Sequence, residues 1–304
     1  NPVYSDYIAR DLLNPLFSSM VARDIFSPAQ KFTAGNYQYI KDRGYAFEQK
    51  LNRNSGNMLD KQLQEYRADE KNAAIPLMIF NSTISRDGRK MMICSQPISF
   101  MMKSSALANE LQASPDAVDF TAMFAKQDPL NIRLLTALRM NASFPYVLPN
   151  VWLPSNPVID VMDAGLRDNY GQETALRFIE NFKDWLQENT SRVVLLQIQD
   201  RQQDNWQQPF ETGSVTDVLI KPGTMLQHNW YKLQSFSQTD QYSYLQTGLG
   251  DALQRISFMY APETEEKGAA LNFHLTAREK IAVKEAFNSK YNQASLEAIK
   301  KLLK

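Results

Sequence analysis

Residues 158–171 constrain the fold of this chain more than any other segment. A short apolar run, residues 158–162, ends at the carboxylate of Asp163, and the small residues Ala164 and Gly165 follow it. A polar turn then leads into a strongly helical stretch. This pattern predicts a core strand whose end carries Asp163 on a tight turn, a place from which side chains often face a cleft.

The elements after Asp163 continue the pattern. Apolar residues recur at helical spacing over the next segment, at Leu176, Ile179, Phe182, Trp185 and Leu186. The apolar run 192–198 then predicts a buried strand. Strand, turn, helix and strand in this order are typical of a parallel α/β layer. The sequence therefore predicts an α/β fold with a parallel sheet beside Asp163.

Two further strands and several helices are expected elsewhere. Residues 75–80 and 90–94 are apolar, and Asp87-Gly88 between them is a turn signal, so we expect a hairpin. Helical spacing predicts helices over residues 3–26, 45–53, 57–71, 130–141 and 222–256. Thr276-Ala277-Arg278-Glu279 is a capping box, which predicts a helix start. No linker or internal repeat interrupts residues 1–304, which predicts one domain.

Composition narrows the class of function. The 304 residues carry no formal net charge, so no global field favours nucleic acid as a partner. Cys94 is the only cysteine, and His228 and His274 are the only histidines, without partners at metal-ligand spacing. No apolar run approaches the roughly 18 residues of a membrane-spanning helix. The composition indicates no compartment.

Asp163-Ala164-Gly165, followed by Asp168-Asn169-Tyr170-Gly171, resembles the Asp-Gly-Gly/Ala motif of patatin-like phospholipases. The Asn-Ala-Ser-Phe-Pro segment that begins at Asn141 is similar to the family's sequence just before that motif. Weaker similarities follow in the family's order along the chain, at Asp42-Arg43-Gly44, residues 79–83 and residues 271–276.

This resemblance implies a patatin-like three-layer α/β/α fold in which Asp163 is the general base of a Ser–Asp dyad. Ala164, Gly165 and Asn169 would support the turn that holds the base, although the family usually has Gly where this chain has Ala164. The implied reaction is hydrolysis of phospholipids or other acyl esters. The resemblance implies no metal and no organic cofactor.

Two family elements do not occur in these residues: the Gly-x-Ser-x-Gly elbow of the nucleophile and the glycine-rich oxyanion loop. In the family both lie before the Asp motif, so here they would fall before Asn1. The chain is therefore expected to be the C-terminal part of a single patatin-like domain, incomplete at its N-terminal side and inactive alone. If central strands are missing, an unpaired sheet edge should bind the N-terminal region or cause self-association.

Two alternatives stay open. The first is a non-catalytic patatin-like scaffold that binds lipid or a protein partner. The second is an unrelated α/β domain in which Asp163 caps a turn, and a structure without a parallel sheet beside Asp163 would favour it. Peripheral contact with a membrane through the apolar face of residues 7–26 is a further partner that the sequence leaves open.

Overall fold

The structure of the chain is a computed structural model. It describes residues 7, 9–12, 30–104, 107, 110, 112–143, 148–199, 215–260, 269 and 274–303, without the side chains of 215–229. The helix predicted over residues 3–26 lies almost wholly outside the described residues, and the apolar face considered for membrane contact lies there with it.

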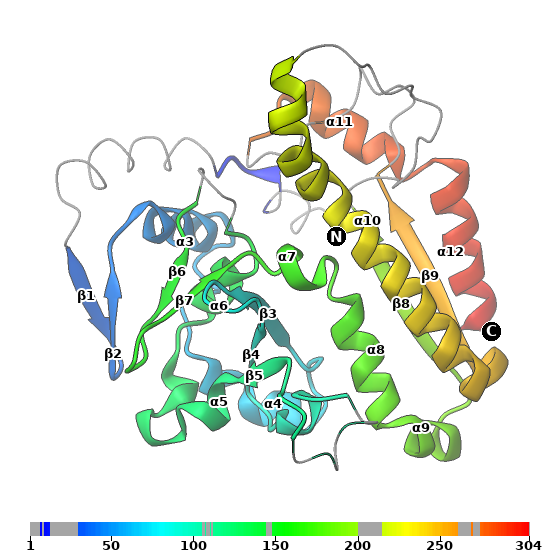
Figure 1. Cartoon of the computed structure of the whole chain (residues 1–304), viewed down its shortest axis with the longest axis horizontal. Helices are drawn as coiled ribbons and strands as arrows, with labels where there is room; N and C mark the ends of the chain where they lie inside the picture. Colours follow the sequence, from blue (N-terminus) through cyan, green and yellow to red (C-terminus); the bar gives the residue numbers. More distant parts are fainter. Residues whose placement is uncertain are drawn as a thin grey trace. The chain divides into compact units, whose positions relative to one another are not determined.

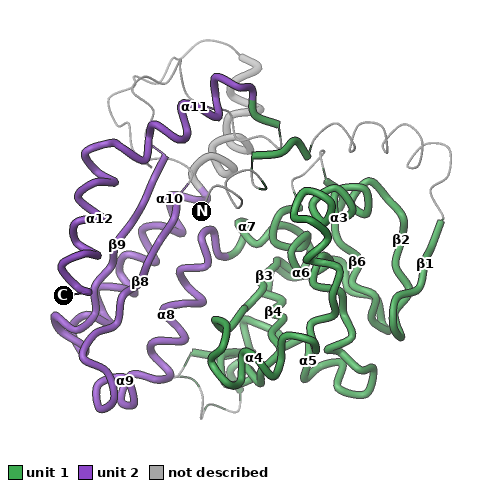
Figure 2. The backbone as a smooth tube through the Cα atoms, turned by 180° about the vertical axis from the view of Figure 1, so that it is seen from behind, with its two compact units in different colours: residues 1–167, 272–275 green, residues 168–271, 276–304 purple. Residues whose placement is uncertain are grey.

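The chain divides into two compact units, which Figure 2 shows in different colours. Unit 1 comprises residues 1–167 and 272–275, and unit 2 comprises residues 168–271 and 276–304. Each has its own hydrophobic core. This division describes packing within each unit, and the prediction of one domain stays a prediction.

Unit 1 is built on a five-stranded mixed sheet in the order β5-β4-β3-β7-β6 (Figure 1). The strands are β3 (Ile79–Ile84), β4 (Lys90–Cys94), β5 (Ala117–Asp119), β6 (Val151–Leu153) and β7 (Ile159–Met162). Only β4 and β5 pair in parallel, and the other three pairings are antiparallel. The predicted α/β class is confirmed at this level.

The predicted hairpin is confirmed, with β3 and β4 paired from Ile79 opposite Cys94 to Thr83 opposite Lys90. Its turn needs Gly88, whose φ of 74° favours glycine. The first strand is displaced from the predicted residues 75–80 towards the C-terminus. Asn81 is a poor strand former, but pairing with neighbouring strands on both sides of β3 overrides that preference.

The prediction of a parallel sheet beside Asp163 is wrong. β7 lies between β3 and β6 and is antiparallel to both. The connection from β6 to β7 spans residues 154–158, and so short a connection joins only antiparallel strands. The strand predicted over 192–198 belongs to a different sheet: β8 (Val193–Gln199) pairs in parallel with β9 (Leu253–Met259) in unit 2.

The remaining elements of unit 1 surround the sheet. A short hairpin, β1 (Lys31–Ala34) and β2 (Tyr37–Ile40), was not predicted because its residues are polar and mixed. The helices are α3 (Arg43–Asn54), η2 (Leu63–Tyr66), α4 (Arg67–Lys71), η3 (Ser99–Met101), α5 (Phe120–Met123), η5 (Ala125–Gln127), η6 (Pro129–Asn131) and α6 (Leu134–Met140). The core includes Phe80, Ile84, Met91, Ile93, Phe120, Ile132, Met140, Val151 and Val161.

The helix α7 (Gly165–Asp168) follows β7, and the elements of unit 2 come after it. They are α8 (Gln172–Asn181), α9 (Lys183–Asn189), β8, α10 (Val215–Leu249), η7 (Gly250–Ala252), β9, α11 (Ala277–Ala286) and α12 (Lys290–Leu302). One face of the β8–β9 pair packs on α8 and α10, through Leu195, Leu253, Leu176, Ile179, Leu245 and Leu249. The helix predicted over 222–256 ends earlier, because its last residues form β9. The capping box of Thr276 and Glu279 is confirmed at the start of α11.

Candidate functional site

Asp163 lies directly after β7, where the sequence placed it, and both its main chain and its side chain are held. Its carbonyl oxygen accepts a 2.8 Å hydrogen bond from Thr83 Oγ1 on β3. Its carboxylate Oδ1 accepts a 2.6 Å hydrogen bond from the amide of Gly165. The turn and the neighbouring strand therefore fix the direction of the carboxylate.

The environment of Asp163 favours a proton on its carboxyl group. The residue is half-buried. Burial raises the pKa of Asp163 from its ordinary 3.8 to about 6, and the hydrogen bond from Gly165 offsets part of that rise. Among the residues that the structure describes, no hydrogen bond or ion pair reaches the second oxygen, Oδ2. A base at Asp163 would therefore take the proton on Oδ2.

The two small residues after Asp163 build the turn without glycine-only angles. Neither Ala164 nor Gly165 has a positive φ, so the alanine that departs from the family pattern is accommodated. The Ala164 carbonyl accepts from Arg167 N at 2.9 Å. Gly165 contributes its amide to Asp163. Asn169 belongs to unit 2, where its amide donates to Gln234 Oε1 at 3.0 Å, and its predicted supporting role stays a prediction.

Strand β3 brings together segments that are far apart in the sequence. The amide of Asn81 donates to Asn141 Oδ1 at 3.1 Å, and Asn141 Nδ2 donates to Ala137 O at 2.8 Å. Two residues further along β3, Thr83 holds Asp163. The sequence marked these segments separately but did not indicate their contacts. Residues 144–147 of the segment that begins at Asn141 lie outside the described residues.

The second carboxylate of the motif, Asp168, has a structural role. It is 1% exposed. It accepts hydrogen bonds from the amides of Glu173 and Thr174, both at 2.9 Å, and from Thr174 Oγ1 at 2.6 Å. These bonds satisfy the first free amides of α8, whose preceding residue Gly171 offers no side chain for capping. Asp168 is therefore a helix cap rather than a candidate base.

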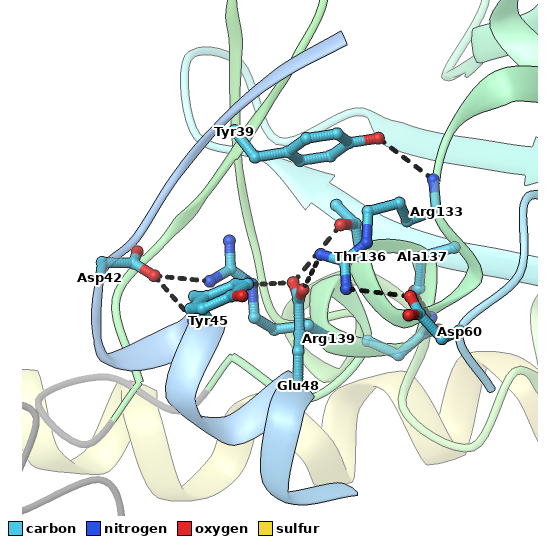
Figure 3. A network of polar contacts seen from close by, with 10 residues as sticks. Tyr39, Asp42, Tyr45, Glu48, Asp60, Arg133, Thr136, Ala137 and Arg139 are labelled. Carbon is cyan, nitrogen blue, oxygen red and sulfur yellow. Dashed lines mark hydrogen bonds and ion pairs between the residues drawn. The ribbon is translucent and has the colours of Figure 1, made fainter. Parts of the chain in front are cut away.

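A buried ionic network in unit 1 joins α3 to α6 (Figure 3). Glu48 on α3 accepts from Arg133 Nη1 at 2.6 Å and pairs with Arg139 Nε at 3.3 Å. Arg139 Nη1 also pairs with Asp42 at 2.9 Å. The adjoining cavity has about 10 Å³, room for no more than one water. We assign this network to the stability of the fold.

The network also explains the Asp42-Arg43-Gly44 segment. Asp42 Oδ1 caps α3 by accepting from Tyr45 N at 2.9 Å. A Cβ atom on Gly44 would lie 1.8 Å from Arg139 Nη1, so glycine leaves the space that the guanidinium fills. Packing and helix capping therefore account for Asp42 and Gly44 in this chain.

A polar groove of about 530 Å³ lies at the C-terminal ends of β4 and β5. Its lining includes Arg67, Ser95, Gln96, Ser99, Asp119 and Asn131. Ser95 donates to the buried carboxylate of Glu70, which also accepts from Met78 N at 2.8 Å. Ser95 is only 3% exposed, so its hydroxyl is not accessible to a substrate in the groove. The sequence did not indicate this groove.

The raised pKa of Asp163 predicts a pH-dependent stability. Between about pH 4 and pH 6 the folded chain binds more protons than the unfolded chain, so stability falls as pH rises through this window. We expect a loss of about 1–3 kcal/mol by pH 8, a range that allows for partial exposure. Asp163→Asn should remove this loss, so that the variant is the more stable protein at pH 8 and the two converge near pH 3.5. Urea unfolding of the wild type and Asp163→Asn between about pH 3.5 and pH 8 measures the difference between their free energies of unfolding. A difference that is constant with pH would contradict the assignment.

The described residues contain no group of three or more His, Cys, Asp or Glu residues that could hold a metal ion. Among them, no helix has the length and apolarity needed to cross a membrane. Comparisons of the chain with protein-family models, curated proteins and solved structures found no match.

Proposed function

We propose that this chain supplies the general base, Asp163, of a patatin-like acyl-ester hydrolase that works through a Ser–Asp dyad. One observation supports this above the others: a half-buried carboxylate at a strand end, held by Thr83 and Gly165, with its pKa raised towards neutrality and Oδ2 without a described partner. A base needs a fixed direction and a pKa near the working pH, and Asp163 has both.

The proposed reaction uses a serine from the region before Asn1. Its hydroxyl attacks the ester carbonyl while Asp163 Oδ2 takes the proton, and backbone amides of that region stabilise the oxyanion. The protonated Asp163 then returns the proton to the leaving alcohol. In the second half of the reaction Asp163 deprotonates the water that attacks the acyl group, and it returns that proton to the serine oxygen as the acid leaves. With a pKa of about 6 the carboxyl group is mostly ionised at pH 7–8, as a base must be.

The same proposal includes the patatin-like fold and the class of substrate. The proposed fold for residues 1–304 is a patatin-like three-layer α/β/α domain, incomplete at its N-terminal side. The substrates are phospholipids or other acyl esters, with peripheral contact to a lipid surface, and no metal or organic cofactor takes part.

The coding region directly upstream of Asn1 tests the proposal. We expect a glycine-rich loop, then an apolar strand that ends in Gly-x-Ser-x-Gly. A native start at Asn1, or an upstream region without such a serine, would leave Asp163 without a nucleophile and refute the proposal.

The 304-residue chain alone should be inactive, because it carries the base without nucleophile or oxyanion hole. We expect no hydrolysis of 4-nitrophenyl butyrate above the rate in buffer. Hydrolysis by these residues alone, abolished by Asp163→Ala, would show that the nucleophile lies within them.

Two alternatives stand beside this proposal. The antiparallel neighbours of β7 and the bond from Gly165 to Asp163 suit an unrelated α/β domain in which Asp163 caps its turn. In a patatin-like scaffold that binds lipid or protein without catalysis, Asp163 would have no serine partner. A degenerate nucleophile motif upstream of Asn1 would favour the scaffold, and the absence of any related upstream sequence would favour the unrelated domain.

A further inference from the structure

The polar groove at the C-terminal ends of β4 and β5 has the place and the size of a ligand site. Its described lining residues all belong to unit 1, and Asp163 is not one of them. The volume of about 530 Å³ is in the range of small-molecule sites. β4 and β5 form the parallel pair of the five-stranded sheet. Open α/β sheets bind their ligands in the crevice beyond the carboxyl ends of such strands.

A buried carboxylate, Asp119, lies in the wall of this groove at the end of β5. Asp119 is 4% exposed. Its Oδ1 accepts from the amides of Thr121 and Ala122 at 2.9 and 3.2 Å, and from Thr121 Oγ1 at 2.6 Å. Its Oδ2 accepts from Ser99 Oγ at 2.6 Å. The group accepts four hydrogen bonds and donates none, as a carboxylate does, and both hydroxyl bonds have the short length of charge-assisted ones.

The hydroxyl groups of Ser99 and Thr121 can therefore act only as acceptors towards the groove. A hydroxyl has one proton, and both residues use theirs on Asp119. Ser99 is exposed and Thr121 is half-buried. Among the described residues, no donor bonds to either hydroxyl oxygen. The two oxygens are polarised by the carboxylate behind them, so they present its negative potential to a ligand.

Two further side chains of the lining favour a positively charged donor. Gln96 Nε2 donates to Arg67 O at 2.9 Å and to Ser95 Oγ at 3.0 Å, which leaves Oε1 as its free polar atom. Asp128 accepts from Asn36 Nδ2 at 2.7 Å through Oδ2 alone. The described lining carries two carboxylates against one guanidinium. The groove thus combines a negative charge balance with acceptors whose own hydrogens are already used.

We propose that this groove binds a small molecule through a protonated primary amine. An ammonium group brings a positive charge and three N–H donors, which suit the acceptors Ser99 Oγ, Thr121 Oγ1 and Gln96 Oε1. A quaternary ammonium has the charge but no donor, and the described lining has no aromatic ring to hold it by cation–π contact. Small apolar residues line the rest of the groove and are left for the uncharged part of the ligand: Pro97, Ala122, Ala125, Pro129 and Leu130. This inference does not rest on the proposed function, because Asp163 takes no part in it.

A matched pair of ligands tests the proposal on the 304-residue chain. Ethanolamine carries the primary ammonium, and choline is its N-trimethyl analogue with the same charge and no N–H donor. We expect ethanolamine to bind with a Kd at least about 10-fold below that of choline. It should also shift the amide resonances of Thr121 and Ala122, whose protons lie on Asp119. Equal Kd values, or binding of neither ligand, would overturn the proposal.

Asp119→Asn reverses the polarity of the site while keeping its shape. Asparagine Oδ1 keeps the bonds from the amides of Thr121 and Ala122, and Nδ2 takes the place of Oδ2 and donates to Ser99 Oγ. The proton of Ser99 then turns to the groove, where it opposes an ammonium group. The Kd for ethanolamine should rise about 10-fold or more, since a hydrogen bond to a charged group is lost. An unchanged Kd would contradict the proposal.

A second variant keeps the test independent of any loss of folding in Asp119→Asn. Asp128 is exposed and has a φ of 49°, which asparagine also tolerates. Asp128→Asn should raise the Kd for ethanolamine about two- to fivefold, the effect of one screened charge. Asp240→Asn, at an exposed position of α10 in unit 2, is the control and should leave the Kd unchanged. Equal Kd values for all three variants would show that ethanolamine does not bind in this groove.

Discussion

Asp163→Asn in the complete polypeptide is expected to lower kcat/KM for 4-nitrophenyl butyrate by about 10²–10⁴-fold, the range that general-base catalysis contributes. Asparagine keeps an oxygen that accepts from Gly165 N at the position of Oδ1, so the turn survives. Its amide group has no basic oxygen for the proton of serine. The wild-type rate should also fall as pH drops below about 6, because Asp163 then becomes protonated.

Asp160→Asn is the matched control for this variant. Asp160 is a half-buried aspartate on the same strand, and its Oδ2 accepts from Asn150 Nδ2 at 3.1 Å. We expect its activity to stay within about threefold of wild type, since its carboxylate has no role in the proposed reaction. If Asp163→Asn retained as much activity as Asp160→Asn, Asp163 would not be the base.

Glu48→Ala is expected to destabilise the protein by about 3–5 kcal/mol, because it leaves two buried guanidinium groups without their shared carboxylate. Arg133 and Arg139 are 5% and 6% exposed, and both pair with Glu48. Glu48→Gln should cost less, since the amide keeps the shape and one acceptor. The free energy of unfolding in urea, measured for both variants, gives the two values.

An exposed ion pair provides the control for Glu48. Glu297 pairs with Lys300 at 2.7 Å, and their side chains are 58% and 55% exposed. Glu297→Ala should leave the free energy of unfolding almost unchanged, because solvent screens an exposed ion pair. A similar small change for Glu48→Ala would show that the network of Figure 3 is not needed for the fold.

Local signals predicted local structure well. The strand end at Asp163, the hairpin turn at Gly88 and the capping box at Thr276 each depend on residues close in sequence, and the structure contains all three. The predicted parallel direction of the strands beside Asp163 was wrong, because an apolar run does not reveal which strands it pairs with. The five-residue connection to β6 decided that outcome.

The contacts that the sequence could not reveal join distant segments. Arg133 lies 85 residues from Glu48 along the chain, and Thr83 lies 80 residues from Asp163. From the sequence alone, Arg133 and Arg139 resemble ordinary surface residues. The groove at the ends of β4 and β5 was hidden for the same reason, because its described lining residues are spread over positions 64–131.

Labelling with a fluorophosphonate tests the central claim most directly, because such probes react with a serine that a neighbouring base activates. The polypeptide extended upstream of Asn1 would be treated with the probe, and the modified peptide identified by mass spectrometry. Our account predicts one modified serine before Asn1, and loss of its modification in Asp163→Asn. Absence of labelling, labelling that Asp163→Asn leaves unchanged, or a modified serine within residues 1–304 would contradict it.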